Sequence, residues 1–246
     1  MKTKLINIML FLAVLVPSVH ATIFTEDGVI DGGTYDDVYI QSDATVDMTA
    51  GTVYTMYIEN LGTLNYHGGI ITEVELRNSG TFNLEESSLS GSALSSWGSG
   101  NFNLDGGAYQ GTLEMWEYSH NIIDSGQLTT ATSDFYDYVI TDIYGGDVVW
   151  NSLSLHGYSA LNIYGGNVSF NSGFNLHEDA EINVHYSDII YLNEWDEIIT
   201  GYHLLDGSEF MLDQFSQYEI DQINFVPEPT TFLLFGLGGI ILRRRK

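Results

Sequence analysis

Paired carboxylates are the most frequent arrangement in this sequence that could support chemistry. Asp36–Asp37, Glu85–Glu86 and Glu178–Asp179 are three adjacent acidic pairs. Glycoside hydrolysis needs two carboxyl groups about 5–9.5 Å apart, one acting as a general acid and the other as a nucleophile or base. Because the chain has 33 acidic residues in 246, such pairs arise by chance. We assign no catalytic residue and predict that the protein is not an enzyme, with a carbohydrate-active enzyme as the alternative.

Basic residues, histidines and cysteines add no catalytic or metal-binding motif. Arg77 is the only Arg or Lys between Lys4 and Arg243, which disfavours a lyase that abstracts a proton with a basic residue. Cysteine is absent, and the seven histidines form no HExxH motif. The chemistry of zinc hydrolases and of cysteine nucleophiles is therefore not expected.

Calcium is the cation that the acidic residues would suit best, because it prefers oxygen ligands. The sequence has neither an EF-hand loop nor the GGxGxDxUx repeat of calcium-binding β-rolls. We therefore predict no cofactor and no defined metal site, with at most weak calcium binding. A calcium-dependent adhesion module is the second alternative function.

Charge is distributed unevenly along the chain. Six of the seven Lys and Arg residues lie at the two ends, whereas all 33 Asp and Glu residues lie between them together with Arg77. This body carries a formal charge near −32, against −26 for the whole chain. Such a surface repels nucleic acid and attracts cations. Nucleic acid is therefore excluded as a partner, and divalent cations are expected around the body.

A repeated pattern runs through the body. The segments "GTLNYHGG" (62–69), "GTFNLEES" (80–87), "GNFNLDGG" (100–107) and "SALNIYGG" (159–166) share an apolar–Asn–apolar triplet followed by a corner. Alternating apolar and polar residues indicate short strands, and glycine pairs indicate turns. The corners recur with a period of about 19 residues, which predicts an all-β fold, a single parallel β-solenoid of about nine turns. An antiparallel sandwich would instead show turn signals about every 8–12 residues.

The polar position of the triplet is the most regular feature of the repeat. It is occupied by Asp47, Asn65, Asn83, Asn103, Asp142, Asn162 and Asn183, and is broken once by Ile122. In a solenoid these side chains align from coil to coil, so we predict a ladder of amides hydrogen-bonded along the rod. The ladder is a structural element, and on this scaffold the alternative enzyme would be of the β-helix type.

Aromatic and imidazole side chains are expected to be packing residues. Trp97, Trp116 and Trp150 could stack on sugars, but packing in the core or at corners is the preferred interpretation. His67 and His185 occupy the same place in distant repeats, just before a corner, and are predicted to be corner residues.

The N-terminus predicts export. Lys2 and Lys4 precede an apolar run, and the run ends in a plausible cleavage site at Ala21. We predict a signal peptide at 1–21, solenoid repeats at 22–187, a C-terminal cap at 188–225 and a sorting segment at 226–246. Residues 22–29 are expected to cover the first turn, since open solenoid ends aggregate.

The C-terminal segment combines three features in a fixed order. A triplet, Pro227, Glu228 and Pro229, precedes eleven apolar or glycine residues at 232–242, and the chain ends in a basic cluster, Arg243, Arg244, Arg245 and Lys246. The prolines oppose helix up to that point. The apolar run is shorter than the ~20 residues that span a bilayer comfortably. We predict a short transmembrane helix whose basic cluster stays in the cytoplasm.

This order of triplet, apolar run and arginine cluster resembles the PEP-CTERM sorting signal of exported bacterial proteins. The resemblance implies export, transient retention in the inner membrane and cleavage near the triplet by an exosortase. It further implies delivery to the cell surface or extracellular polysaccharide matrix of a Gram-negative bacterium. The predicted function is structural or adhesive, performed by an acidic rod that meets cations and matrix polysaccharide.

Overall fold

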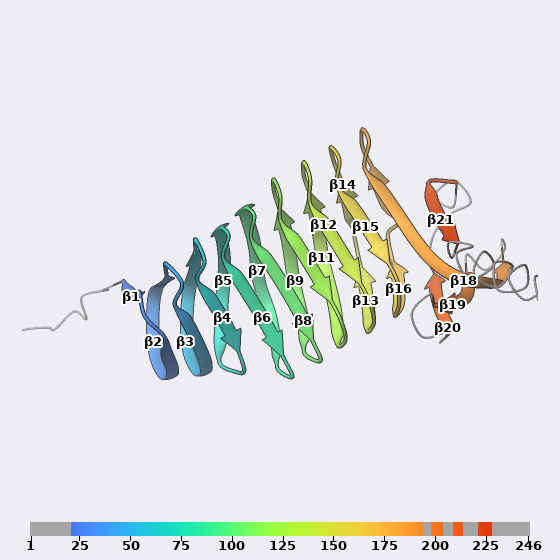
Figure 1. Ribbon diagram of the computed structural model, residues 1–246. Helices are drawn as coiled ribbons and strands as arrows, with labels where there is room; N and C mark the ends of the chain where they lie inside the picture. The colour runs from blue at the N-terminus through green and yellow to red at the C-terminus, as the bar shows by residue number, and fades with distance from the viewer. Residues whose placement is uncertain (1–20, 194–197, 204–208, 214–220, 228–246) are drawn as a thin grey trace, which may run out of the picture.

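The structure, a computed structural model, describes residues 21–193, 198–203, 209–213 and 221–227. Within these residues the chain forms 21 β-strands and no helix. Figure 1 shows the strands wound into coils that stack along one direction and form a rod. Strands of successive coils pair in parallel. The predicted all-β parallel solenoid is therefore confirmed, and the antiparallel sandwich is not found in the coils.

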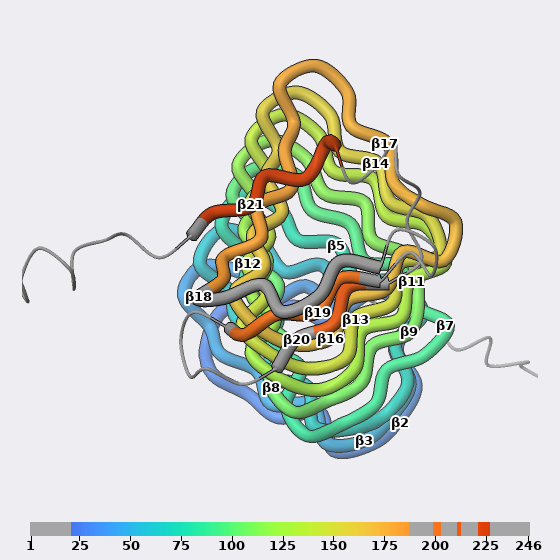
Figure 2. The backbone as a smooth tube through the Cα atoms, turned by 90° about the vertical axis from the view of Figure 1, so that its right-hand side faces the viewer, coloured from blue at the N-terminus to red at the C-terminus, as the bar shows by residue number. Residues whose placement is uncertain are grey.

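Each coil has three faces, and the view along the rod shows each coil as a three-sided loop (Figure 2). Face A contains the first parts of β2 (Gly28–Ile40) and β3 (Thr45–Glu59), then β4 (Thr63–Tyr66), β6 (Thr81–Glu85), β8 (Asn101–Asp105), β10 (His120–Ile123), β12 (Ile140–Ile143), β15 (Ala160–Ile163) and the first part of β18 (Glu181–Asn193). Faces B and C follow in that order along the chain. In the earlier coils one strand supplies both faces: the later parts of β2 and β3, then β5 (Ile70–Asn78), β7 (Ser88–Gly98), β9 (Ala108–Met115) and β11 (Gln127–Phe135). In the later coils each face has its own strands, which are β13 (Asp147–Trp150) and β16 (Asn167–Phe170) on face B and β14 (Leu153–Leu155) and β17 (Phe174–Leu176) on face C.

Alternation of side chains separates the core from the surface. In a strand, neighbouring side chains point to opposite faces of the sheet, so each face sends alternate residues inward. On face A one inward column includes Leu64, Phe82 and Phe102, all fully buried, and the rings of the two phenylalanines stack 5.7 Å apart. Each buried apolar side chain of this size stabilises the fold by about 1.5–3 kcal/mol. The core is therefore a set of apolar columns along the rod axis.

The rod has about eight turns, so the prediction of nine was wrong by one. Among the described residues no further parallel turn is completed, because the chain changes direction after face A of the last coil. There β18 pairs antiparallel with β19 (Ile198–His203), which pairs antiparallel with β20 (Glu209–Asp213). Finally β21 (Ile223–Pro227) returns to pair in parallel with β18.

The two ends of the rod are covered differently. At the C-terminal end, β20 pairs with β16 on face B and β21 pairs with β18 on face A. At the N-terminal end, β1 (Thr22–Phe24) pairs with residues 38–40 of β2, which lie on face C. Residues 22–24 thus cover only face C with a paired strand, whereas residues 28–29 already belong to face A of the first coil. Asp27 adds a side-chain cap, because its Oδ1 accepts a hydrogen bond of 2.8 Å from the amide of Thr45.

Glycines at corresponding corners should differ in their tolerance of a side chain. Gly165 lies against the preceding coil, and a Cβ there would overlap the carbonyl oxygen of Tyr144. Gly32 occupies the same place in the first coil, where no atom lies within 4 Å of the Cβ position. We expect Gly165→Ala to lower the free energy of unfolding by about 1–3 kcal/mol and Gly32→Ala to change it by less than about 0.5 kcal/mol. Urea unfolding of both variants checks this, and equal effects would contradict the stacking that the structure shows.

Candidate functional site

A ladder of hydrogen-bonded side chains runs along the outer surface of face A, as predicted. Each amide Nδ2 donates to the Oδ1 of the preceding coil: Asn65 to Asp47, Asn83 to Asn65 and Asn103 to Asn83, each at 2.8 Å. The ladder resumes with Asn162 to Asp142 at 2.8 Å, Asn183 to Asn162 at 3.0 Å and Asn224 to Asn183 at 3.1 Å. The ladder is therefore structural, and it extends to β21, which the repeat pattern did not include.

The break at Ile122 has a structural reason that the sequence did not reveal. In β10 the polar and apolar residues of the triplet are exchanged. Asn121 takes the inward position that Phe102 has in β8, and Ile122 takes the outward position of Asn103. Buried Asn121 donates a hydrogen bond of 2.9 Å to Oγ1 of Thr141, the inward residue of the next coil. On the outer side, the Oδ1 of Asn103 is buried and accepts no hydrogen bond within the part of the chain that the structure describes.

Restoring the missing rung should stabilise the protein. In Ile122→Asn, the new amide would donate to the orphaned Oδ1 of Asn103, and an unsatisfied buried acceptor costs about 1–3 kcal/mol. We expect the free energy of unfolding to rise by about 1 kcal/mol after the loss of the half-buried isoleucine is included. Ile122→Ala, which removes the side chain without supplying a donor, is the matched control and should be destabilising. A lower stability for the asparagine variant than for the alanine variant would show that the ladder cannot be continued here.

Stacked rings form further columns on the outer surface. One column joins Trp97, Trp116, Tyr136, His156 and His177, whose successive ring centroids lie 5.0, 3.9, 4.6 and 4.3 Å apart. A second joins Tyr118, Tyr138 and Tyr158 at the next corner, with spacings of 5.1 and 5.2 Å. A third joins Tyr144, Tyr164 and His185 beside the amide ladder. Within each stack the ring faces contact one another, which leaves only edges and end faces for other partners.

The tryptophans divide between core and surface. Trp150 is fully buried, and Trp97 and Trp116 are stacked in the first column with Trp97 46% exposed. Packing is therefore the role of Trp150, as predicted, whereas Trp97 keeps a free ring surface. His67 directly follows β4, where a corner residue is expected, whereas His185 lies within β18, pairs with Val226 of β21 and stacks on Tyr164 of the preceding coil at 4.2 Å. The repeat pattern did not predict the ring columns, although their members recur with its period.

Protonation of His156 should weaken the fold. The pKa of His156 lies below its usual 6.5, first because burial disfavours the charged ring and then because of His177, which together outweigh the opposing effect of Asp134 and Glu178. The unfolded chain therefore binds a proton at a higher pH than the folded one does. Stability is fully present above pH 6.5 and falls as the pH decreases toward the pKa of the folded state.

NMR titration of the ring protons of His156 measures this directly and should give a pKa below 6.5. The variant His156→Tyr has the same residue as Tyr136 of the preceding coil and does not titrate in this range. Its free energy of unfolding should therefore fall less than that of the native protein between pH 7.5 and 5.5. A native pKa at or above 6.5 would contradict the burial and the like-charge contact described here.

The three acidic pairs are not brought together. Asp36–Asp37 lies in the first coil, Glu85–Glu86 lies at the corner between β6 and β7, and Glu178–Asp179 lies in the turn after β17. Glu85 and Glu86 line a depression of about 450 Å³ with His67, Asp105, Gly106 and Ser125. The hydroxyl of Ser125 donates a hydrogen bond of 2.9 Å to Oδ1 of Asp105. Among the residues that the structure describes, no group of three or more His, Asp or Glu side chains is arranged to hold a metal ion.

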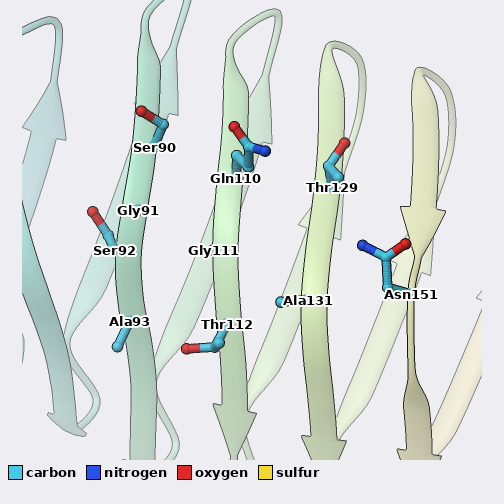
Figure 3. Close-up of a pocket in the computed structure, with 10 residues that line it drawn as sticks. All are labelled: Ser90, Gly91, Ser92, Ala93, Gln110, Gly111, Thr112, Thr129, Ala131 and Asn151. Carbon is cyan, nitrogen blue, oxygen red and sulfur yellow. The ribbon is translucent and has the colours of Figure 1, made fainter.

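An uncharged groove of about 550 Å³ crosses the corner between faces B and C (Figure 3). It is lined by Ser90, Gly91, Ser92, Ala93, Gln110, Gly111, Thr112, Thr129, Ala131 and Asn151. The groove exists because the corner of β9 is one residue shorter than those of β7 and β11, as register shifts between Ser90 and Ser92 and between Thr130 and Ser133 show. On a body this acidic, a groove without charged residues is distinctive, although none of its lining residues is aromatic.

A third depression surrounds the single cation of the body. Arg77 donates hydrogen bonds to Glu75 at 2.6 and 3.0 Å and to Glu59 at 3.0 Å, and its guanidinium lies 4.2 Å from the ring centre of Tyr57. The depression, about 370 Å³, is lined by Glu75, Arg77, Asn78, Trp97, Gly98 and Glu117. It combines the indole of Trp97 with donors and acceptors, whereas the ring that lines the second depression is the smaller imidazole of His67 and the uncharged groove has no ring.

Comparison with known protein families identifies the C-terminus. Residues 225–246 match the family described as the PEP-CTERM protein-sorting motif. The chain ends in a PEP-CTERM sorting signal. Such a signal is recognised by an exosortase and implies export with transient membrane association. Comparisons with curated proteins and with solved structures gave no match.

Most residues of the two terminal segments lie outside the described part of the structure. Pro227 ends β21, whereas Glu228, Pro229 and the basic cluster Arg243–Lys246 lie beyond it. Ala21, the predicted cleavage position, directly precedes β1, and residues 1–20 of the predicted signal peptide are not described. No helix among the described residues is long and apolar enough to cross a membrane. The predicted transmembrane segment at 232–242 is not among those residues.

Proposed function

We propose that this protein is a non-enzymatic structural or adhesive rod of the cell surface or extracellular polysaccharide matrix of a Gram-negative bacterium. An exosortase would cut it near Pro227, Glu228 and Pro229 after a signal peptide ending at Ala21 has been removed. The apolar segment and the basic cluster Arg243–Lys246 would hold the protein in the inner membrane until that cut. The observation that carries the proposal is the PEP-CTERM motif at residues 225–246, which begins within β21, the last strand that the structure describes.

The construction of the body supports a mechanical role. Parallel strands, an apolar core and the amide ladder hold the coils together without any disulfide, since the chain has no cysteine. Stacked rings add contacts between consecutive coils on the outside. Such a rod keeps its shape when only its ends are held, as an adhesive spacer requires.

The placement of the carboxylates also supports a binding role over an enzymatic one. Glu85 and Asp105 follow each other on face A, whereas on face C Ser95 separates Glu75 from Glu114, which is followed by Asp134. Carboxylates spread over different faces form a diffuse negative surface that gathers calcium and other cations without a defined site. Weak, unspecific calcium binding is part of the proposal.

A carbohydrate-active β-helix enzyme is the second candidate, favoured by the depression that Glu85, Glu86 and Asp105 share. The two candidates differ in one measurement. An enzyme would release reducing ends from a matrix polysaccharide and lose that activity in Glu85→Gln and Asp105→Asn, whereas the structural rod releases none.

Cleavage and release test the sorting proposal. In the native host, the intact mass should show the loss of the segment that follows Pro229, residues 230–246, and the protein should leave the inner membrane. Without the exosortase, the uncut chain should stay in the membrane fraction. A variant that replaces Pro227, Glu228 and Pro229 by alanine serves as the matched control and should behave like the uncut chain. An uncut protein in the presence of the enzyme would make the tail a simple anchor.

A further inference from the structure

Trp97 begins its ring column, and this leaves one face of its indole open. Trp116, in the following coil, stacks on one side of Trp97 with an angle of 7° between the rings. Because the stacked rings lie across the rod axis, the other face of Trp97 is turned toward the preceding coil. The residue of that coil in register with Trp97 is Arg77, which carries no ring. The depression of about 370 Å³ lies on this side, and Trp97 is 46% exposed.

Arg77 does not cover the open indole face. Its guanidinium is turned toward the coil before it, where it lies over Tyr57 and pairs with Glu59. Of the five N–H donors of a guanidinium, three are used in the hydrogen bonds to Glu59 and Glu75. The side chain remains 39% exposed. Arg77 is thus fixed in place beside the pocket with donors still available.

The pocket owes its space to a glycine in a column of left-handed residues. Asn60, Asn78, Gly98, Glu117 and Asp137 share a positive φ at the same corner of successive coils. The side-chain Nδ2 of Asn78 donates a hydrogen bond of 3.4 Å to Oδ1 of Asn60 in the preceding coil. The Oδ1 of Asn78 therefore faces the following coil as an acceptor. That coil has Gly98 in register, which offers no side chain. Glu117, one coil further, closes the pocket with a carboxylate.

We propose that this pocket binds one hexose unit of an uncharged polysaccharide. The apolar C–H face of a pyranose would lie on the open indole face of Trp97, as aromatic rings accept flat apolar partners. Its hydroxyls would accept from Arg77 and donate to Oδ1 of Asn78 and to the carboxylate of Glu117. The volume lies within the range of small-ligand pockets, and the opening allows a chain to continue on either side. This inference rests on the proposed extracellular role and names the partner of that role.

The charge of the surroundings selects an uncharged sugar. Glu59 and Glu75 already neutralise Arg77, and Glu117 adds a further negative charge beside the ring. A uronic acid would bring its carboxylate into a net negative pocket on a body of formal charge near −32, with 33 acidic residues against one arginine. The hydroxyls of a neutral hexose can satisfy both the remaining donors and the acceptors without that cost.

Titration with short oligosaccharides tests the inference. The full-length protein would be titrated with neutral oligomers of glucose, galactose or mannose, with the corresponding monosaccharides and with oligogalacturonate. The readout is the NMR signal of the indole N–H of Trp97, assigned by its absence in Trp97→Leu. We expect at least one neutral oligosaccharide to shift this signal, its monosaccharide to bind about tenfold more weakly, and oligogalacturonate to leave the signal unchanged.

Two variants should weaken the binding of that oligosaccharide and one should not. Trp97→Leu should raise the dissociation constant, followed by calorimetry, by about tenfold or more. Asn78→Gly should also raise it, and it keeps the backbone because glycine accepts the positive φ of 58° at this position. Tyr158→Leu is the matched control: it removes an exposed ring, 58% accessible, from the end of another stack and should bind like the native protein.

Several results would overturn the inference. No shift with any neutral sugar, or binding unaffected by Trp97→Leu, would remove the site. Tighter binding of oligogalacturonate would refute the preference for an uncharged chain, and equal binding of the monosaccharide would refute a polysaccharide partner. A protein that is cut and released normally but binds none of these sugars would refute this inference and leave the proposed sorting and rod function intact. An uncut protein that still binds a neutral sugar would refute the proposed sorting and leave this inference intact.

Discussion

Parallel stacking of coils in register is the constraint on which the rest of this structure depends. Neighbouring strands lie about 4.8 Å apart, so each residue has the corresponding residue of the next coil as its nearest side-chain neighbour. Backbone hydrogen bonds fix this arrangement, and whatever type of side chain occupies a position is then repeated along the rod. Apolar positions become core columns, Asn and Asp become the amide ladder, and aromatic positions become stacks. One geometric rule therefore produces the core, the surface order and the depressions.

Departures from the rule generate the places where something else can bind. The uncharged groove arises where the corner of β9 is one residue shorter than its neighbours. The pocket beside Trp97 arises where Gly98 interrupts a column of side chains, and where a ring stack begins. The orphaned Oδ1 of Asn103 marks the interrupted ladder. In a periodic structure, such irregularities make one coil differ in shape and in free polar groups from the next.

The repeat of the sequence was sufficient to predict the fold class and the amide ladder. Spacing of the Asn and Asp positions determines both, because a nearly constant period can align them only if the strands are parallel. What the sequence did not reveal depends on local register. A shift of one residue in β10 would have turned Ile122 inward and Asn121 outward. Burial of Ile123 in the core selects the observed register, in which Asn121 is buried. The antiparallel strands β19 and β20 follow no repeat, and the pocket at Trp97 depends on the direction that Arg77 takes.

Coil length increases along the rod, and this decides whether the rod can grow. The sequence separation between ladder partners is 18 from Asp47 to Asn65 near one end, and 21 from Asn162 to Asn183 near the other. A second copy placed on the broad end would meet β20 and β21, which already pair with the last coils there, and its own first coils are shorter than those coils. Its first coil would also bring the aspartates of β2, which would meet further negative charge. Coils of unequal length thus oppose the end-to-end stacking of two copies in register.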